Sequence, residues 1–150
     1  MSPDYRELLS VFSDAEVRFL VVGAYALGVH GIPRATKDLD LWIEANPKNA
    51  AKVVDALRRY GAPLHELDVM DLTLWGVCLQ IGRPLHRVDI VTTADGLAFE
   101  SAWLNRLEIM IEGLRVPTIG REDLIRNKRE TGRAQDKVDA ERLERLTRST

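Results

Sequence analysis

The sequence predicts a single α/β (α+β) domain over residues 1–150, with a central mixed β-sheet, flanking helices and a helical C-terminal end. The chain has 150 residues and 45% of them are hydrophobic, which suffices for one packed core and is short for two. Short apolar runs of strand length alternate with amphipathic helical segments. We therefore expect a core over about residues 17–118 and C-terminal helices over about 120–147.

The chain begins with a predicted helix, a strand and a second helix. Residues 4–15 carry apolar side chains at helical spacing, after a serine and a proline that suit a helix start. Residues 19–22 form a short apolar run that ends at Gly23, and residues 24–30 can form a short helix before a turn.

The next segment predicts a strand with two different faces. Between residues 38 and 43, leucine and isoleucine alternate with aspartate and tryptophan, which is the period of a β-strand. Asn46 then starts a helix that Gly61 ends. We expect this helix to cross over the sheet and to bury one face, formed by Ala51, Val54 and Leu57.

The remaining segments predict sheet followed by helices. Residues 74–81 and 85–91 are strand candidates, and residues 107–117 form a hairpin. From residue 121 onward, helical spacing of Leu124, Ile125, Val138, Leu143 and Leu146 predicts two helices that separate near Gly132.

The charge balance excludes a protein that holds nucleic acid by an overall basic surface. Lys plus Arg number 21, Asp plus Glu number 23, and the net charge is -2. No apolar run reaches the roughly 18 residues of a membrane span. The chain opens with a proline and an acid rather than an apolar leader, and we expect a cytoplasmic protein that makes no membrane contact.

The cysteine, histidine and tryptophan residues favour packing over chemistry. The single cysteine, Cys78, lies in an apolar run and is expected in the core. His30, His65 and His86 have no metal-ligand spacing. The tryptophans at 42, 75 and 103 are expected to pack in the core or at its edge, with base stacking by the one at 42 as an alternative.

Three aspartates form the candidate catalytic centre. Asp38 and Asp40 share one face of the predicted strand, and Asp89 lies in a second strand where its neighbours face the other way. If Asp38 and Asp40 are considered without Asp89, the alternative explanation is a solvated strand face whose charges pair with Arg34 or Lys37. Three converging carboxylates would repel one another without a divalent cation, and Mg²⁺ suits such oxygen ligands and shares phosphate oxygens.

A glycine turn supplies a possible phosphate contact. Gly23 and Ala24 follow an apolar strand and open a helix, which leaves backbone N–H groups free to hold an anion. A simple tight turn is the alternative explanation. The phosphate-binding loop, the dinucleotide-binding fingerprint and the hydrolase nucleophile elbow are all absent from the sequence.

The ordered set of Val22-Gly23-Ala24, Asp38-Leu39-Asp40-Leu41 and Asp89 resembles the nucleotidyltransferases of the DNA polymerase β superfamily. Residues 123–128 and 132–139 also look like the C-terminal segment of small bacterial AbiEii-toxin-like and uncharacterised nucleotidyltransferases. The likeness covers roughly residues 19–146. Ala24 departs from the pattern, which has Gly or Ser there, so a hydroxyl contact to phosphate is lost.

The resemblance implies a nucleotidyltransferase fold and transfer of a nucleoside monophosphate from a nucleoside triphosphate, such as ATP, to an acceptor hydroxyl. It implies two Mg²⁺ ions, or Mn²⁺ in their place, bridged by Asp38 and Asp40 and completed by Asp89. Its candidate nucleotide contacts are Gly23, Ala24, Arg34, Lys128 and Arg133. A solvated helix face is the alternative for the last two.

The resemblance leaves the acceptor open among small molecules, tRNA and protein side chains. The oligomeric state is also open. A second interpretation is a catalytically degenerate module that binds a nucleotide or a partner, for example one component of a toxin–antitoxin pair.

Overall fold

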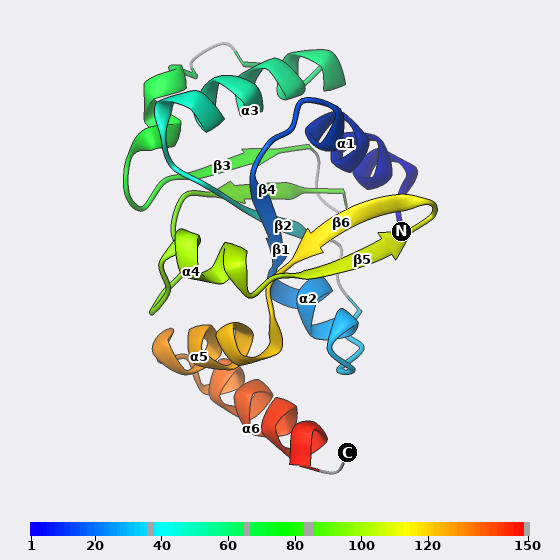
Figure 1. Cartoon of the computed structure of the whole chain (residues 1–150), viewed down its shortest axis with the longest axis vertical. Helices are drawn as coiled ribbons and strands as arrows, with labels where there is room; N and C mark the ends of the chain where they lie inside the picture. The colour runs from blue at the N-terminus through cyan, green and yellow to red at the C-terminus, as the bar shows by residue number, and fades with distance from the viewer. Residues whose placement is uncertain (36–37, 65–66, 83–85, 149–150) are drawn as a thin grey trace.

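The computed structural model describes residues 1–35, 38–64, 67–82 and 86–148. Within these residues a six-stranded sheet has the order β3-β4-β2-β1-β6-β5 (Figure 1). Its strands are β1 (Phe19–Val22), β2 (Leu39–Ile43), β3 (Cys78–Ile81), β4 (Val88–Val91), β5 (Leu107–Ile111) and β6 (Leu114–Thr118).

The sheet is mixed, as the sequence predicted. β2 pairs in parallel with β4 and β1 pairs in parallel with β6, while β1–β2, β3–β4 and β5–β6 are antiparallel. β2 and β4 can be parallel neighbours because the chain returns between them through a helix, which is the crossover that parallel pairing requires.

Helices lie on both faces of the sheet, with α1 and α3 above it and α2, α4, α5 and α6 below it in the view of Figure 1. They are α1 (Pro3–Asp14), α2 (Gly23–Val29), α3 (Pro47–Tyr60), the 3-10 helix η1 (Val69–Thr73), α4 (Phe99–Leu104), α5 (Arg121–Glu130) and α6 (Ala134–Arg148). None of the described helices is both long enough and apolar enough to cross a membrane.

Capping residues explain where α1 and α3 begin and where α3 ends. Ser2 Oγ accepts a hydrogen bond from the Asp4 amide at 3.3 Å, and the Asn46 side chain accepts one from the Asn49 amide at 2.8 Å. Gly61 ends α3 in the left-handed region at φ 92, where a side chain would be strained.

Alternation along β2 divides the core into two layers. Leu39, Leu41 and Ile43 pack with α1 and α3, whereas Trp42 packs with α2, α4, α5 and α6. The sequence predicted this division, and the same alternation places Asp40 on the side of Trp42.

The structure corrects several predicted boundaries. In α3, Ala51 is exposed and Ala50 and Val53 are buried instead, because the helix turns a slightly different stripe to the sheet. The strand predicted over 74–81 begins only at Cys78, after η1, and the strand predicted over 85–91 begins at Val88. Arg83, Pro84 and Leu85 lie outside the described residues.

Cys78 and Trp75 were wrongly predicted to be buried. β3 lies at the edge of the sheet, and Cys78 is exposed there. Trp75 is 86% exposed in the loop before β3. Trp42 is fully buried with its ring edge-on to Phe99 at 5.1 Å, so packing rather than base stacking explains it.

Candidate active site

The parallel pairing of β2 and β4 brings two of the three predicted carboxylates together. Asp40 in β2 is the direct register partner of Asp89 in β4, and neighbouring strands lie about 4.8 Å apart. Asp38, one residue before β2, is on the same side by alternation and acts electrostatically on Asp40. The predicted juxtaposition of Asp40 and Asp89 is therefore confirmed, and their catalytic role stays a prediction.

The site holds more negative charge than its protein surroundings offset. Burial, which is the largest cause, and the negative charges of Asp89 and Asp38 together raise the pKa of Asp40 to about 6. A hydrogen bond to Asp89 favours the protonated form, while the Lys128 ammonium opposes the shift. Oδ1 of Asp89 is buried and has no hydrogen-bond partner among the residues that the structure describes.

Gly23 is required where the end of β1 meets Asp40. Its φ is +68, and a Cβ added there would lie 2.1 Å from Oδ2 of Asp40. Only a residue without a side chain admits the carboxylate this close to the turn. Ala24 follows as the second residue of α2, and its amide remains a predicted phosphate contact.

Lys128 is not the solvated side chain that the sequence predicted as an alternative. It is 8% exposed, and its Nζ donates a hydrogen bond to Oδ1 of Asp136 at 3.0 Å. Its effect on the pKa of Asp40 places its charge within electrostatic range of the carboxylates. Predicted site residues from the C-terminal helices and the sheet thus approach one another.

The guanidinium of Arg34 is committed to a protein carboxylate. Its Nη1 and Nη2 donate to Oδ2 and Oδ1 of Asp139 at 2.9 and 2.6 Å. Arg133 donates from Nε to Oδ2 of Asp136 at 2.8 Å and is otherwise exposed. The predicted nucleotide contacts of Arg34 and Arg133 would therefore have to use guanidinium N–H groups that these ion pairs leave available.

The described histidines serve packing and backbone contacts, as expected. His30 is buried with Nε2 2.7 Å from the carbonyl oxygen of Ile119, and His86 lies edge-on to Tyr5. His65, like Lys37, lies outside the described residues. In the part of the chain that the structure describes, no three His, Cys, Asp or Glu side chains are grouped closely enough to hold a metal ion by themselves.

Asp136 and Asp139 lie in the C-terminal segment that carries the family resemblance, but the sequence did not place them among the candidate site residues, and both are buried. The available signal was their spacing of three residues in α6, on the face that also carries Ala140 and Leu143. A carboxylate in line with buried apolar positions indicates a buried ionic partner.

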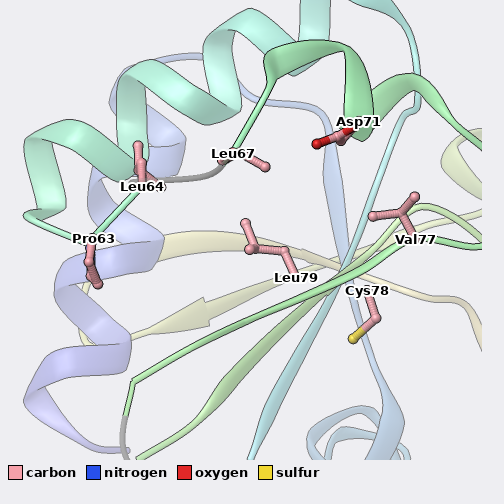
Figure 2. Close-up of a pocket in the computed structure, with 7 residues that line it drawn as sticks. All are labelled: Pro63, Leu64, Leu67, Asp71, Val77, Cys78 and Leu79. Atoms are coloured by element: carbon pink, nitrogen blue, oxygen red, sulfur yellow. The ribbon is translucent and has the colours of Figure 1, made fainter.

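A separate cavity of about 580 Å³ lies on the other face of the sheet, between β3 and the chain that follows α3. Figure 2 shows Val77 and Leu79 directed toward this cavity and the Cys78 sulfur directed to the opposite side of the strand. That opposite side carries Asp89, since Gln80 of β3 is the register partner of Asp89. The cavity is therefore not part of the carboxylate site.

The fold is that of the nucleotidyltransferases. It matches a protein from Thermotoga maritima (TM1012) that is assigned as a nucleotidyltransferase, with a TM-score of 0.63 at 13% identity over 100% of this chain and 96% of that one. The lincosamide antibiotic adenylyltransferase LnuA with bound lincomycin gives 0.59 at 16% identity, over 96% of each chain. ANT(2")-Ia in complex with adenylyl-2"-tobramycin gives 0.57 at 17% identity, over 93% of this chain and 84% of that one.

Residues 5–147 match the family model described as "Nucleotidyltransferase of unknown function (DUF6036)". The chain belongs to this family and is a nucleotidyltransferase, as the sequence predicted. No curated protein matches it in sequence.

Proposed function

We propose that this enzyme transfers the nucleoside monophosphate of a nucleoside triphosphate to an acceptor hydroxyl at the centre formed by Asp38, Asp40 and Asp89. The observation that carries the proposal is the register pairing of Asp40 with Asp89, which concentrates negative charge beside an unpartnered buried oxygen. Such a site is unfavourable for the protein alone and becomes favourable when a cation and a phosphate complete it.

The residues present fit a divalent cation. Asp40 and Asp89 supply hard oxygen ligands, and burial together with the charges of Asp89 and Asp38 raises the pKa of Asp40, which is an environment that a cation would stabilise. Mg²⁺, or Mn²⁺, would be held by Asp40 and Asp89 with Asp38 beside them. When bound it would neutralise the phosphate charge that develops during transfer. Since two carboxylates are brought together rather than three, substrate oxygens and water would complete its coordination.

The protein's own groups contribute a proton acceptor and positioning. The acceptor oxygen forms a bond to the α-phosphorus, the bond from that phosphorus to the bridging oxygen breaks, and pyrophosphate leaves. Asp89 is suited to take the hydroxyl proton because its buried Oδ1 has no partner among the described residues. Lys128 would offer positive charge to the triphosphate.

The relatives in structure support ATP as the donor and a small hydroxylated molecule as the acceptor. LnuA is an adenylyltransferase that holds lincomycin, and ANT(2")-Ia holds an adenylylated tobramycin. Adenylyl transfer is accordingly the first activity to test for this chain, with tRNA and protein acceptors as the other two classes.

The decisive experiment incubates the enzyme with ATP labelled at the α-phosphorus, Mg²⁺ and a cell lysate. The wild type should label an acceptor, and digestion with RNase or protease identifies its class. Asp40→Asn and Asp89→Asn should each lower labelling by about 10³-fold, because each removes a charge that the transfer requires. Asp55→Asn is the matched control, since Asp55 is exposed and pairs with Arg59 on the surface of α3.

The same assay separates the second candidate, a binding module such as a toxin–antitoxin component of the AbiEii-like type. Ala24 favours that candidate because the family pattern has a hydroxyl or a glycine at this position. A binding module would bind ATP or a partner in calorimetry and would label nothing. Full labelling by Asp40→Asn would refute the proposed centre.

A further inference from the structure

A buried ionic network connects the C-terminal helices to the segment before β2. It consists of Arg34, Lys128, Arg133, Asp136 and Asp139. At its centre Asp139 is 0% exposed and accepts hydrogen bonds from Arg34 and from Gln135, the latter at 3.1 Å. Lys128 Nζ lies 4.0 Å from Oδ2 of the same carboxylate. One buried carboxylate thus holds a cation from α5 and a cation from the α2–β2 connection.

The other carboxylate fixes the end of α5. Asp136 accepts hydrogen bonds from Lys128 at 3.0 Å, from the Thr131 hydroxyl at 2.6 Å and from Arg133. Burial alone would raise the pKa of Asp136 and Asp139, but hydrogen bonds from these donors and the nearby positive charges hold both values below the ordinary one. Both carboxylates are therefore charged at neutral pH.

The network carries three positive and two negative side chains, so it is not neutral. The network acts electrostatically on the carboxylates of the sheet, because the Lys128 ammonium lowers the pKa of Asp40 against the larger effect of burial. A neutral apolar contact could join the helices to the sheet equally well, as Leu124, Ala140 and Leu143 do in the same layer. Replacing buried ion pairs by apolar contacts is often neutral or stabilising, so stability alone gives no reason for this network.

We propose that Asp139 is a positioning residue for nucleotidyl transfer, which holds the charged groups of Lys128 and Arg34 in fixed positions relative to the carboxylate centre. The inference rests on the proposed function. Arg34 lies four residues before Asp38, and its two-bond contact with Asp139 fixes both the direction and the distance of the attachment. The Lys128 ammonium lies close to both carboxylates, which fixes the position from which it would contact a triphosphate.

The first test compares Asp139→Asn with Glu112→Gln, which breaks the Arg6–Glu112 pair at the surface and serves as the matched control. Rates are measured per folded molecule, well below the unfolding midpoint of each variant. We expect kcat to fall about 10- to 100-fold in Asp139→Asn and to stay unchanged in Glu112→Gln, because a small misplacement of a charged group costs about this much. Arg34→Lys should recover part of the rate that Arg34→Gln loses.

The double variant Arg34→Gln with Asp139→Asn separates positioning from stability. The double variant leaves neither the arginine nor the aspartate charge without its partner, so the unfolding midpoint should recover part of what the single variants lose. The kcat should stay low, since Lys128 has lost its second carboxylate. Joint recovery of midpoint and kcat would assign a structural role only and would overturn the proposal.

A second readout needs no activity. In the wild type, an amine-reactive acetylating reagent should modify Lys128 far more slowly than the exposed Lys48, and Asp139→Asn should raise the Lys128 rate about tenfold. An inactive wild type that binds no ATP would refute the proposed function. An active wild type with equal kcat and equal Lys128 labelling in Asp139→Asn would refute the positioning role alone.

Discussion

The two faces of the sheet are covered by different kinds of side chain. The layer under α1 and α3 is formed by apolar side chains such as Phe12, Leu41 and Leu57. The layer toward α2, α5 and α6 also contains the buried charges of Lys128, Asp136 and Asp139, and it borders the Asp40–Asp89 pair. Burial of apolar side chains stabilises the fold on one face of the sheet. On the other face, part of that stabilisation is lost because charged side chains are buried there.

The largest effect should come from the apolar face. Phe12 is fully buried with its ring edge-on to Phe19 at 5.4 Å. Phe12→Ala should lower the free energy of unfolding by about 3 to 5 kcal/mol, because it removes buried surface and leaves a cavity. Urea denaturation followed by circular dichroism measures this loss. A loss below about 1 kcal/mol would show that this face does not dominate stability.

Lys128→Ala should come next, at about 3 kcal/mol, because it leaves two buried carboxylates short of a cation. In the sequence, a solvated helix face was the alternative explanation for Lys128, and the burial of this side chain excludes that alternative. Denaturant unfolding of Lys128→Ala beside Lys137→Ala, an exposed lysine of α6, gives the comparison. Equal stability of the two variants would contradict the buried network.

Asp40→Asn should stabilise the metal-free enzyme as the pH rises. The folded chain raises the pKa of Asp40 to about 6, so it binds this proton more tightly than the unfolded chain does. The stability that the proton contributes is complete below about pH 4 and is lost as the pH rises through 6. Asp40→Asn should match the wild type near pH 4 and exceed it by about 2 to 3 kcal/mol at pH 7.

Thermal unfolding at several pH values in the presence of a chelator measures this difference. Added Mg²⁺ should raise the midpoint of the wild type and leave Asp40→Asn nearly unchanged. A constant difference in stability between the wild type and Asp40→Asn across this pH range would mean that the raised pKa belongs to a residue other than Asp40.

The smallest effect should be that of Cys78→Ser. Cys78 is exposed on an edge strand and pairs with Val91 only through the backbone ladder, so unfolding should change by less than about 0.5 kcal/mol. The same urea titration applies. A loss of 2 kcal/mol or more would return Cys78 to the core, where the sequence had placed it.

Sequence patterns predicted those parts of the molecule that depend on neighbours along the chain. Alternation identified β2 and its two faces, and cap residues located α1 and α3. The helix α4 was missed because its six residues are too short to show a helical period. The pairing of Asp40 with Asp89 could be predicted because each of these two aspartates interrupts an apolar strand.

The rest depends on partners that are distant in the sequence. The exposure of Cys78 follows from β3 lying at the edge of the sheet, which no local pattern encodes. The burial of Lys128 follows from the fold of α6 against α5, and the engagement of Arg34 follows from Asp139. Charges that meet only in the folded state look like surface charges in the sequence.

The ionic network also has a consequence for synthesis on the ribosome. The chain emerges in the order Asp38 and Asp40, then Asp89, then Lys128, and the carboxylate that holds Arg34 emerges only with α6. A nascent chain that ends before α6 can pair β2 with β4 and still lacks the anchor for Lys128 and Arg34. Release of α6 from the exit tunnel is therefore the event that supplies the carboxylates that pair with Lys128 and Arg34.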